Sequence, residues 1–263
     1  MKQVVTALLG VVMLAGIAQA GVVVEEQQTI DRGVGTPSTN KITVMVQGNK
    51  QKYVVGDGNQ SSITDLDQGT RMMVSNARKM YVEMPFPPKG MMMPPNSNRS
   101  PLAFKKTGAH EKIAGYACDD YSGTGSLGEN EMTVTGCFST SAPGAANFTA
   151  FQKTMTAKVK GTPMALMSDT PSGIPLKIDT SLKQKSGARP PVVTHMTVTK
   201  VTEQDLPADT FAPPKDYTKQ QMPMMGMTGP GMGGRPMGPG MMGKPVPGAS
   251  PASPAAAPNK VPE

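Results

Sequence analysis

Two histidines, two cysteines and no tryptophan occur among the 263 residues, so the side chains that carry much enzyme chemistry are scarce. A hydrolase would need a histidine beside a nucleophile and a carboxylate to orient it. Glu111 adjoins His110, but neighbouring residues on a strand point to opposite faces. The sequence also lacks a G-x-S-x-G motif. We therefore interpret His110 and His195 as ordinary strand residues and expect a protein that is not an enzyme.

A basic cluster interleaved with aromatic residues, the pattern typical of nucleic-acid binding, is also missing. The formal net charge is +7, but the lysines and arginines are spread along the chain, and aromatic residues make up only 4% of it. We therefore expect no nucleic-acid partner.

The N-terminus has the pattern of a secretory signal. Lys2 precedes an apolar run, Val4–Ile17, which ends in the A-x-A site Ala18-Gln19-Ala20. The run is too short to span a membrane comfortably, and no cysteine follows it that could carry a lipid anchor. We predict a signal peptide at residues 1–20, cleavage near Ala20, and a periplasmic or secreted mature chain without a transmembrane segment.

The two cysteines lie in segments that look like short strands, residues 115–121 and 136–138, joined by a polar, glycine-rich run at 122–131 that could turn the chain back. In an oxidising compartment, Cys118 and Cys137 are most simply explained as one disulfide, worth about 3 kcal/mol in the chain-entropy model. A reactive thiol or a metal-thiolate site is the alternative. The sequence has no C-x-x-C, and neither cysteine has a histidine close by.

The glycine-rich run also spells G-x-G-x-x-G at residues 123–128. A dinucleotide fingerprint needs a preceding strand and a following helix, so that the phosphate meets a helix N-terminus. Here the motif links two antiparallel strands, and Glu129 and Glu131 would repel phosphate. We do not interpret it as a nucleotide site.

Alternating apolar and polar residues predict an antiparallel meander before residue 85. In residues 41–46, for example, Ile42, Val44 and Val46 fall on one face. The proline density of residues 85–101 permits no regular element and predicts a long loop, with Met91–Met93 at its centre. Other strands are predicted at residues 21–30, 52–55, 62–67, 71–74, 79–84, 104–108, 110–121, 173–185 and 192–201.

One segment has helical spacing. Phe148, Phe151, Met155 and Val159 recur at intervals of three and four residues, which places them on one face of a helix. Asn147 could cap this helix, or the helix could start earlier, at Ser141. An apolar stripe of this kind is typical of a helix that packs on an antiparallel sheet.

From residue 218 to 263 the composition changes to methionine, proline, glycine and alanine, which predicts a disordered tail. Thioether sulfur is a soft ligand that suits Cu(I), so copper binding by the tail is one hypothesis. A low-complexity linker and a scavenger of oxidants are the alternatives. The candidate metal ligands are Met222, Met224, Met225, Met227, Met232, Met237, Met241 and Met242.

Three further stretches are distinctive: residues 107–118 (TGAHEKIAGYAC), residues 173–178 (GIPLKI), and residues 206–217, which contain LPADTF and PKDY. They resemble, in this order, the paired strands that end in a cysteine, a strand start and the C-terminal motif of an exported bacterial family of unknown function that is grouped with the LolA/LolB-like lipoprotein carriers. The likeness covers residues 21–217, which we take as one domain.

The resemblance implies a mainly β (α+β) fold: a curved antiparallel sheet, or half-barrel, packed over one or two helices. Related carriers hold an acyl chain between sheet and helices. This sequence departs from the family in lacking a tryptophan after the second cysteine strand, in its loop at 85–101 and in its extra tail. We expect an envelope protein that binds an apolar ligand, such as a lipid, or a protein partner through the concave sheet. A copper-handling protein and an envelope scaffold are the alternatives, and no catalytic residue is transferred.

Overall fold

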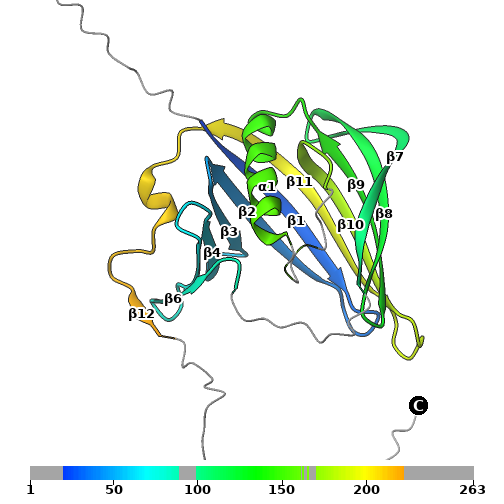
Figure 1. Cartoon of the computed structure of the whole chain (residues 1–263), viewed down its shortest axis with the longest axis horizontal. Coiled ribbons are helices and arrows are strands. Elements are labelled where there is room, and N and C mark those ends of the chain that lie inside the picture. Colours follow the sequence, from blue (N-terminus) through cyan, green and yellow to red (C-terminus); the bar gives the residue numbers. More distant parts are fainter. Residues whose placement is uncertain (1–19, 89–98, 161, 163–164, 166–169, 222–263) are drawn as a thin grey trace, which may run out of the picture. The chain divides into compact units, whose positions relative to one another are not determined.

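The computed structural model describes residues 20–88, 99–160, 162, 165 and 170–221 (Figure 1). The predicted signal segment up to residue 19, the centre of the loop at 85–101 and the methionine-rich tail from Met222 lie outside the described residues.

Twelve strands form one curved sheet in the order β12-β6-β5-β4-β3-β2-β1-β11-β10-β9-β8-β7 (Figure 1). Every neighbouring pair is antiparallel except β12 and β6, which run parallel. The predicted curved antiparallel sheet is therefore confirmed. The strands are β1 (Gly21–Asp31), β2 (Ser38–Gln47), β3 (Lys50–Val55), β4 (Gln60–Asp65), β5 (Thr70–Ser75), β6 (Met80–Pro85), β7 (Arg99–Ile113), β8 (Tyr116–Leu127), β9 (Asn130–Ser139), β10 (Ile174–Gln184), β11 (Val192–Gln204) and β12 (Thr218–Gln220).

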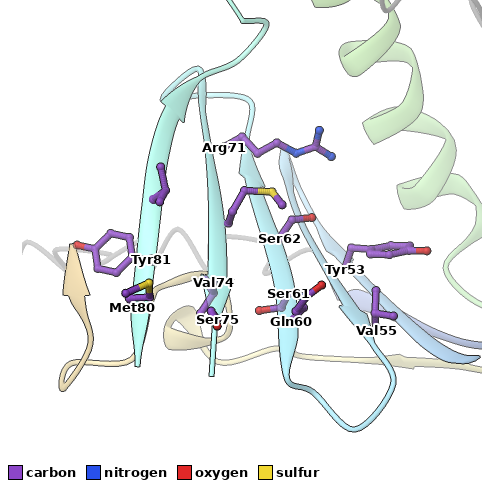
Figure 2. Close-up of a pocket in the computed structure, with 12 residues that line it drawn as sticks. Tyr53, Val55, Gln60, Ser61, Ser62, Arg71, Val74, Ser75, Met80 and Tyr81 are labelled. Carbon is purple, nitrogen blue, oxygen red and sulfur yellow. The ribbon is translucent and has the colours of Figure 1, made fainter. Parts of the chain in front are cut away.

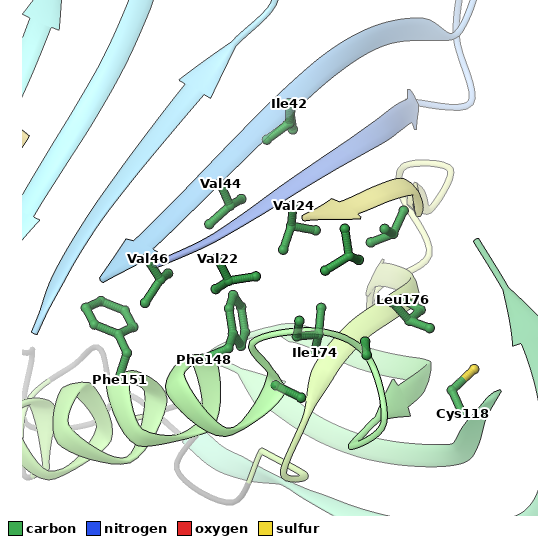
Figure 3. Close-up of a cluster of buried hydrophobic side chains, with 14 of the residues drawn as sticks. Val22, Val24, Ile42, Val44, Val46, Cys118, Phe148, Phe151, Ile174 and Leu176 are labelled. Atoms are coloured by element: carbon green, nitrogen blue, oxygen red, sulfur yellow. The ribbon is translucent and has the colours of Figure 1, made fainter. Parts of the chain in front are cut away.

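Helix α1 (Ala145–Val159) lies across one face of β1, β2 and β10, which we call the helix face (Figure 1). Its predicted apolar stripe is confirmed, because Phe148, Phe151 and Val159 are buried and Met155 packs against the same cluster. Strand residues that alternate inward, such as Val22, complete this core (Figure 3). Full burial of a side chain such as Phe151 contributes about 1.5–3 kcal/mol.

The start of α1 differs from the expectation. Its N-cap is Gly144 at φ 70°, and a Cβ there would lie 2.6 Å from Cβ of Val22, so glycine meets both the backbone conformation and the close packing. Asn147 does not cap the helix. Its side-chain amide donates to the carbonyl of Ala20 at 2.7 Å, which fixes the start of β1 to the helix.

On the opposite face of the sheet, which we call the outer face, the C-terminal segment 206–217 packs over the part formed by β3 to β5, including the 3₁₀ helix η2 (Ala208–Phe211). Leu206 and Phe211 form a second buried cluster with Ile63 of β4 and Val74 of β5. The chain then adds β12 to the edge strand β6. The folded part thus extends through the three residues of β12, beyond the boundary that we predicted at residue 217.

The cysteine hairpin has longer strands and a shorter turn than predicted. Residues 122–127 are part of β8, and only Gly128 and Glu129 separate β8 from β9. Glycines in this run allow close approach of the edge strand, because a Cβ at Gly125 would lie 2.8 Å from the carbonyl oxygen of Ser100 in β7. The prediction that these glycines form a turn is correct only for Gly128 and wrong for Gly123 and Gly125.

Cys118 and Cys137 form a disulfide that joins β8 to β9, with 5.4 Å between their Cα atoms. Neither cysteine is free, so the reactive-thiol and metal-thiolate alternatives do not apply to the structure as described.

Candidate ligand-binding site

The helix face of the sheet extends past the strands that α1 contacts, as the pairing of β2 to β6 shows. Residues directly opposite each other on neighbouring strands share a face of the sheet. Val44 of β2 belongs to the core under α1, and its partner in β3 is Tyr53. The same row continues through Ser62 of β4 and Met73 of β5 to Val82 of β6. Four strands, β3 to β6, therefore continue the surface on which the helix packs.

A hollow of about 490 Å³ lies over β3 to β6 (Figure 2). Its apolar lining includes Val55, Met73, Met80 and Val82. The volume falls in the range of about 300–1,000 Å³ that is usual for small-molecule sites. Met73 is 51% exposed, so the hollow leaves a large apolar side chain open to solvent. An apolar concavity of this size favours an apolar ligand over a polar metabolite.

Arg71 of β5 supplies the charge at this hollow. Its side chain extends over the face that carries Ser62 and Tyr53 (Figure 2). The guanidinium carbon lies 5.6 Å from the centre of the Phe86 ring, in a cation–π arrangement. Nε is buried and has no hydrogen-bond partner in the part of the chain that the structure describes, and burial lowers the pKa of the guanidinium. Among the described residues, no aspartate or glutamate forms an ion pair with Arg71.

Glu26 of β1 places a buried carboxyl group among residues of the helix-face core. Its cross-strand partners are apolar, Ile42 in β2 and Val198 in β11, and the residue is only 7% exposed. Burial raises the pKa of Glu26 to about 7. Burial, and then the negative charge of Glu26, raise the pKa of Tyr53 to about 12. Tyr53 contacts the helix-face core and also lines the hollow, so it connects the two regions.

The predicted site residues fall elsewhere. The disulfide Cys118–Cys137 lies in β8 and β9, across the sheet from β3 to β6. The eight methionines proposed as copper ligands, from Met222 to Met242, lie outside the described residues. In the part that the structure describes, no group of three or more His, Cys, Asp and Glu side chains could hold a metal ion.

Each histidine is paired with an aspartate across two strands. Nδ1 of His110 lies 2.6 Å from a carboxylate oxygen of Asp119, and Nδ1 of His195 lies 2.7 Å from one of Asp179. Within the described ranges, no serine or cysteine joins either pair by a hydrogen bond. These pairs are therefore cross-strand surface contacts and do not form a catalytic triad.

Sequence reasoning missed Arg71, Tyr53 and Glu26. A signal for Glu26 was present, because it occupies the inward position in the alternation Val22, Val24, Glu26. No comparable signal marked Arg71, since strands with one exposed face commonly carry charges.

None of the described helices is long and apolar enough to cross a membrane.

Several solved structures share part of this chain's path. The structure of PNGF-II has a TM-score of 0.40 at 13% identity, covering 77% of this chain and 31% of that one, so this chain spans about a third of its length. A DUF1329 family protein from Desulfovibrio piger has a TM-score of 0.33 at 10% identity, covering 74% and 90%. A LolA superfamily protein from Nitrosomonas europaea has a TM-score of 0.30 at 10% identity, covering 73% and 90%. None of them supplies a functional residue for this chain.

No curated protein matches the sequence. A family model does, the one described as "Domain of unknown function (DUF4412)", over residues 38–217. The match includes β2 to β6, with Arg71 and the whole hollow, and begins after β1 and Glu26. Because the model covers more than half of the chain, the chain belongs to the DUF4412 family.

Proposed function

We propose that this protein is an exported, non-enzymatic binding protein that holds an apolar ligand, such as an acyl chain, on the helix face of β3 to β6. The observation that carries the proposal is the apolar hollow of about 490 Å³ at the open end of the core. Burying apolar surface gains about 25 cal/mol per Å², so a ligand that covers this lining binds favourably.

The shape of the site favours a small ligand over a protein partner. A standard protein interface buries about 800 Å² on each side and is usually broad. Here the apolar side chains Val55, Met73, Met80 and Val82 line a concavity, and the exposed one, Met73, has a flexible thioether that adapts to different ligand shapes. An acyl chain matches both properties.

Export is consistent with the disulfide and with the predicted signal segment at residues 1–20. Disulfides persist in oxidising compartments and are rare in the cytosol of most organisms. A carrier or sensor of apolar molecules in the periplasm or outside the cell would meet lipids and fatty acids there.

The test is to place a charge in the hollow. We expect Met73→Glu to weaken binding of the neutral fluorophore N-phenylnaphthylamine by about tenfold or more, because the ligand would have to desolvate a carboxylate. Val34→Glu is the matched control, since Val34 is 77% exposed and lies outside the hollow. We expect Val34→Glu to bind the probe like the wild type.

Two results would contradict the proposal. The first is a wild-type protein that binds no neutral apolar probe. The second is a Met73→Glu variant that keeps its fold, judged by its unchanged thermal midpoint, and still binds the probe as tightly as the wild type.

A further inference from the structure

We infer that the ligand is a single-chain amphiphile with an anionic head group, and that Arg71 binds this head. The inference rests on the proposed apolar ligand and adds its chemical class. It starts from the distribution of charge over the two faces of β3 to β6.

Arg71 is the one charged residue on the helix face of these four strands. The register sorts their charged residues cleanly, because Lys50 pairs with Asp65 and Lys52 pairs with Ile63, all on the outer face. Glu83 of β6 pairs with Met72 and belongs to that face too. The hollow thus combines a mostly apolar lining, with uncharged polar residues such as Ser62, and a single positive charge.

Among the described residues, this charge has no acidic partner within ion-pair distance. Buried or partly buried cations are costly unless they are paired, and a guanidinium has five donors to satisfy. The Phe86 ring stabilises the cation from one side by a cation–π contact, but the Nε proton has no acceptor among the described residues. A bound anion would supply the missing negative charge, and carboxylate and phosphate groups match the planar guanidinium in a two-point contact.

The position of Arg71 gives the ligand a direction. Two rows of the register make most of the lining, one through Tyr53, Ser62, Met73 and Val82 and the other through Val55, Gln60, Ser75 and Met80. Arg71 belongs to the next row, with Thr64, and so stands at one end of the hollow. Rows on one face are about 6.6 Å apart along a strand. A head group at Arg71 therefore leaves its chain to lie over Met73 and on toward Val55.

The size of the hollow favours a ligand with one chain. A cavity of about 490 Å³ is typical of sites that enclose one drug-sized molecule. A fatty acid or a single-chain alkyl phosphate meets this limit, whereas a two-chain phospholipid would leave one chain in solvent.

The experiment compares ligands that share one chain and differ in the head group. Dodecanoate, dodecyl phosphate, dodecanol and dodecyltrimethylammonium are titrated calorimetrically into the purified protein below their micellar concentrations at pH 8. We expect both anions to bind about tenfold or more tightly than dodecanol, and the ammonium to bind most weakly, because charge-assisted hydrogen bonds are stronger than neutral ones. The tighter of the two anions shows whether a carboxylate or a phosphate is the better head.

Arg71→Met tests the residue, since methionine keeps an unbranched apolar stem and removes the charge. We expect this variant to bind the anions only as well as dodecanol, and to bind dodecanol like the wild type. Lys52→Met is the control. It removes a cation from the outer face of β3 and should keep the preference for anions. If Arg71→Met does not fold, the ranking of head groups by the wild type decides.

Each failure has a distinct meaning. Equal affinity for all four amphiphiles, or an anion preference that survives Arg71→Met, overturns the role of Arg71 while the apolar site stands. No binding of any amphiphile overturns the proposed function and this inference together.

Discussion

The same four strands, β3 to β6, have one face that is covered by other parts of the chain and one face that is open to solvent. On the outer face, the segment 206–217 returns over the sheet, and Phe211 packs onto Ile63 and Val74. On the helix face, α1 packs on β1, β2 and β10, and the next strands stay open, with Met73 51% exposed. A sheet needs one closed face for stability, so closing the outer face leaves the helix face available to a ligand.

The charges differ in the same way. On the outer face Lys50 and Asp65 form an ion pair of 3.3 Å, and Glu83 at the edge pairs with Lys219 of β12 at 2.7 Å. On the helix face, Arg71 has an aromatic neighbour and no acidic partner among the described residues. The outer face of these strands thus carries charges of both signs, two pairs of them in contact and Lys52 besides, whereas the charged residue on their helix face is a cation.

The comparison predicts its largest effect for Phe211→Ala on the outer face. Phe211 is 8% exposed and closes the outer cluster, so its removal leaves a cavity. We expect the free energy of unfolding to fall by about 3–5 kcal/mol, as for other buried phenylalanines. Urea denaturation followed by circular dichroism measures it.

Met73→Ala is the matched change on the helix face. Because half of Met73 is already in solvent, we expect a loss of only about 0.5 kcal/mol, together with weaker ligand binding. Similar losses for Phe211→Ala and Met73→Ala would show that the two faces contribute equally to the core and that the hollow is not a free surface.

Glu26 gives the next largest effect, and it depends on pH. Its pKa is raised from the ordinary value of 4.5 to about 7, so the folded protein keeps a proton that the unfolded chain has released. The stabilising contribution is complete below pH 4.5 and is lost as the pH rises to 7, by roughly 3 kcal/mol in all. We expect Glu26→Gln, which does not titrate, to flatten this decline in the free energy of unfolding.

Glu25→Gln is the control from the adjacent position in β1. Glu25 is exposed and lies 3.5 Å from Lys200, so its loss should leave the decline between pH 4.5 and 7 as steep as in the wild type. Urea denaturation across this pH range measures both variants. A Glu26→Gln variant with the wild-type slope would show that another group causes the pH dependence.

Much of the fold could be predicted because it follows from local patterns. The alternation in Ile42, Val44 and Val46 predicted a strand that buries one face, and the spacing of Phe148 and Phe151 predicted the helix that covers it. The disulfide could be predicted because the chain has two cysteines and a predicted signal for export to an oxidising compartment.

The site depends on long-range packing, which the sequence does not express. Ser62 and Met73 look like any half-exposed strand residues, and only the positions of α1 and of segment 206–217 decide which face stays open. Gly125 shows a second limit, because a glycine that allows close strand approach has the same local signature as one in a turn.

The smallest effect on stability is expected at the edge of the sheet, where the tail begins. A chain that ends at Gln221 keeps β12 on β6, whereas a chain that ends at Tyr217 loses this strand and the contact of Lys219 with Glu83. We expect the first to unfold like the full chain and the second to be slightly less stable, since β12 is exposed and adds little apolar burial.

The same pair of chains tests the copper hypothesis without disturbing the hollow. If the methionines from Met222 to Met242 bind Cu(I), competition with a chromogenic Cu(I) chelator should detect binding by the full chain and none by the chain that ends at Gln221. Both should bind N-phenylnaphthylamine alike, because the residues that line the hollow end at Val82. Equal Cu(I) binding by the two chains would contradict a metal role for the tail. Weaker binding of the fluorophore by the chain that ends at Gln221 would contradict the assignment of the probe site to the residues of β3 to β6 alone.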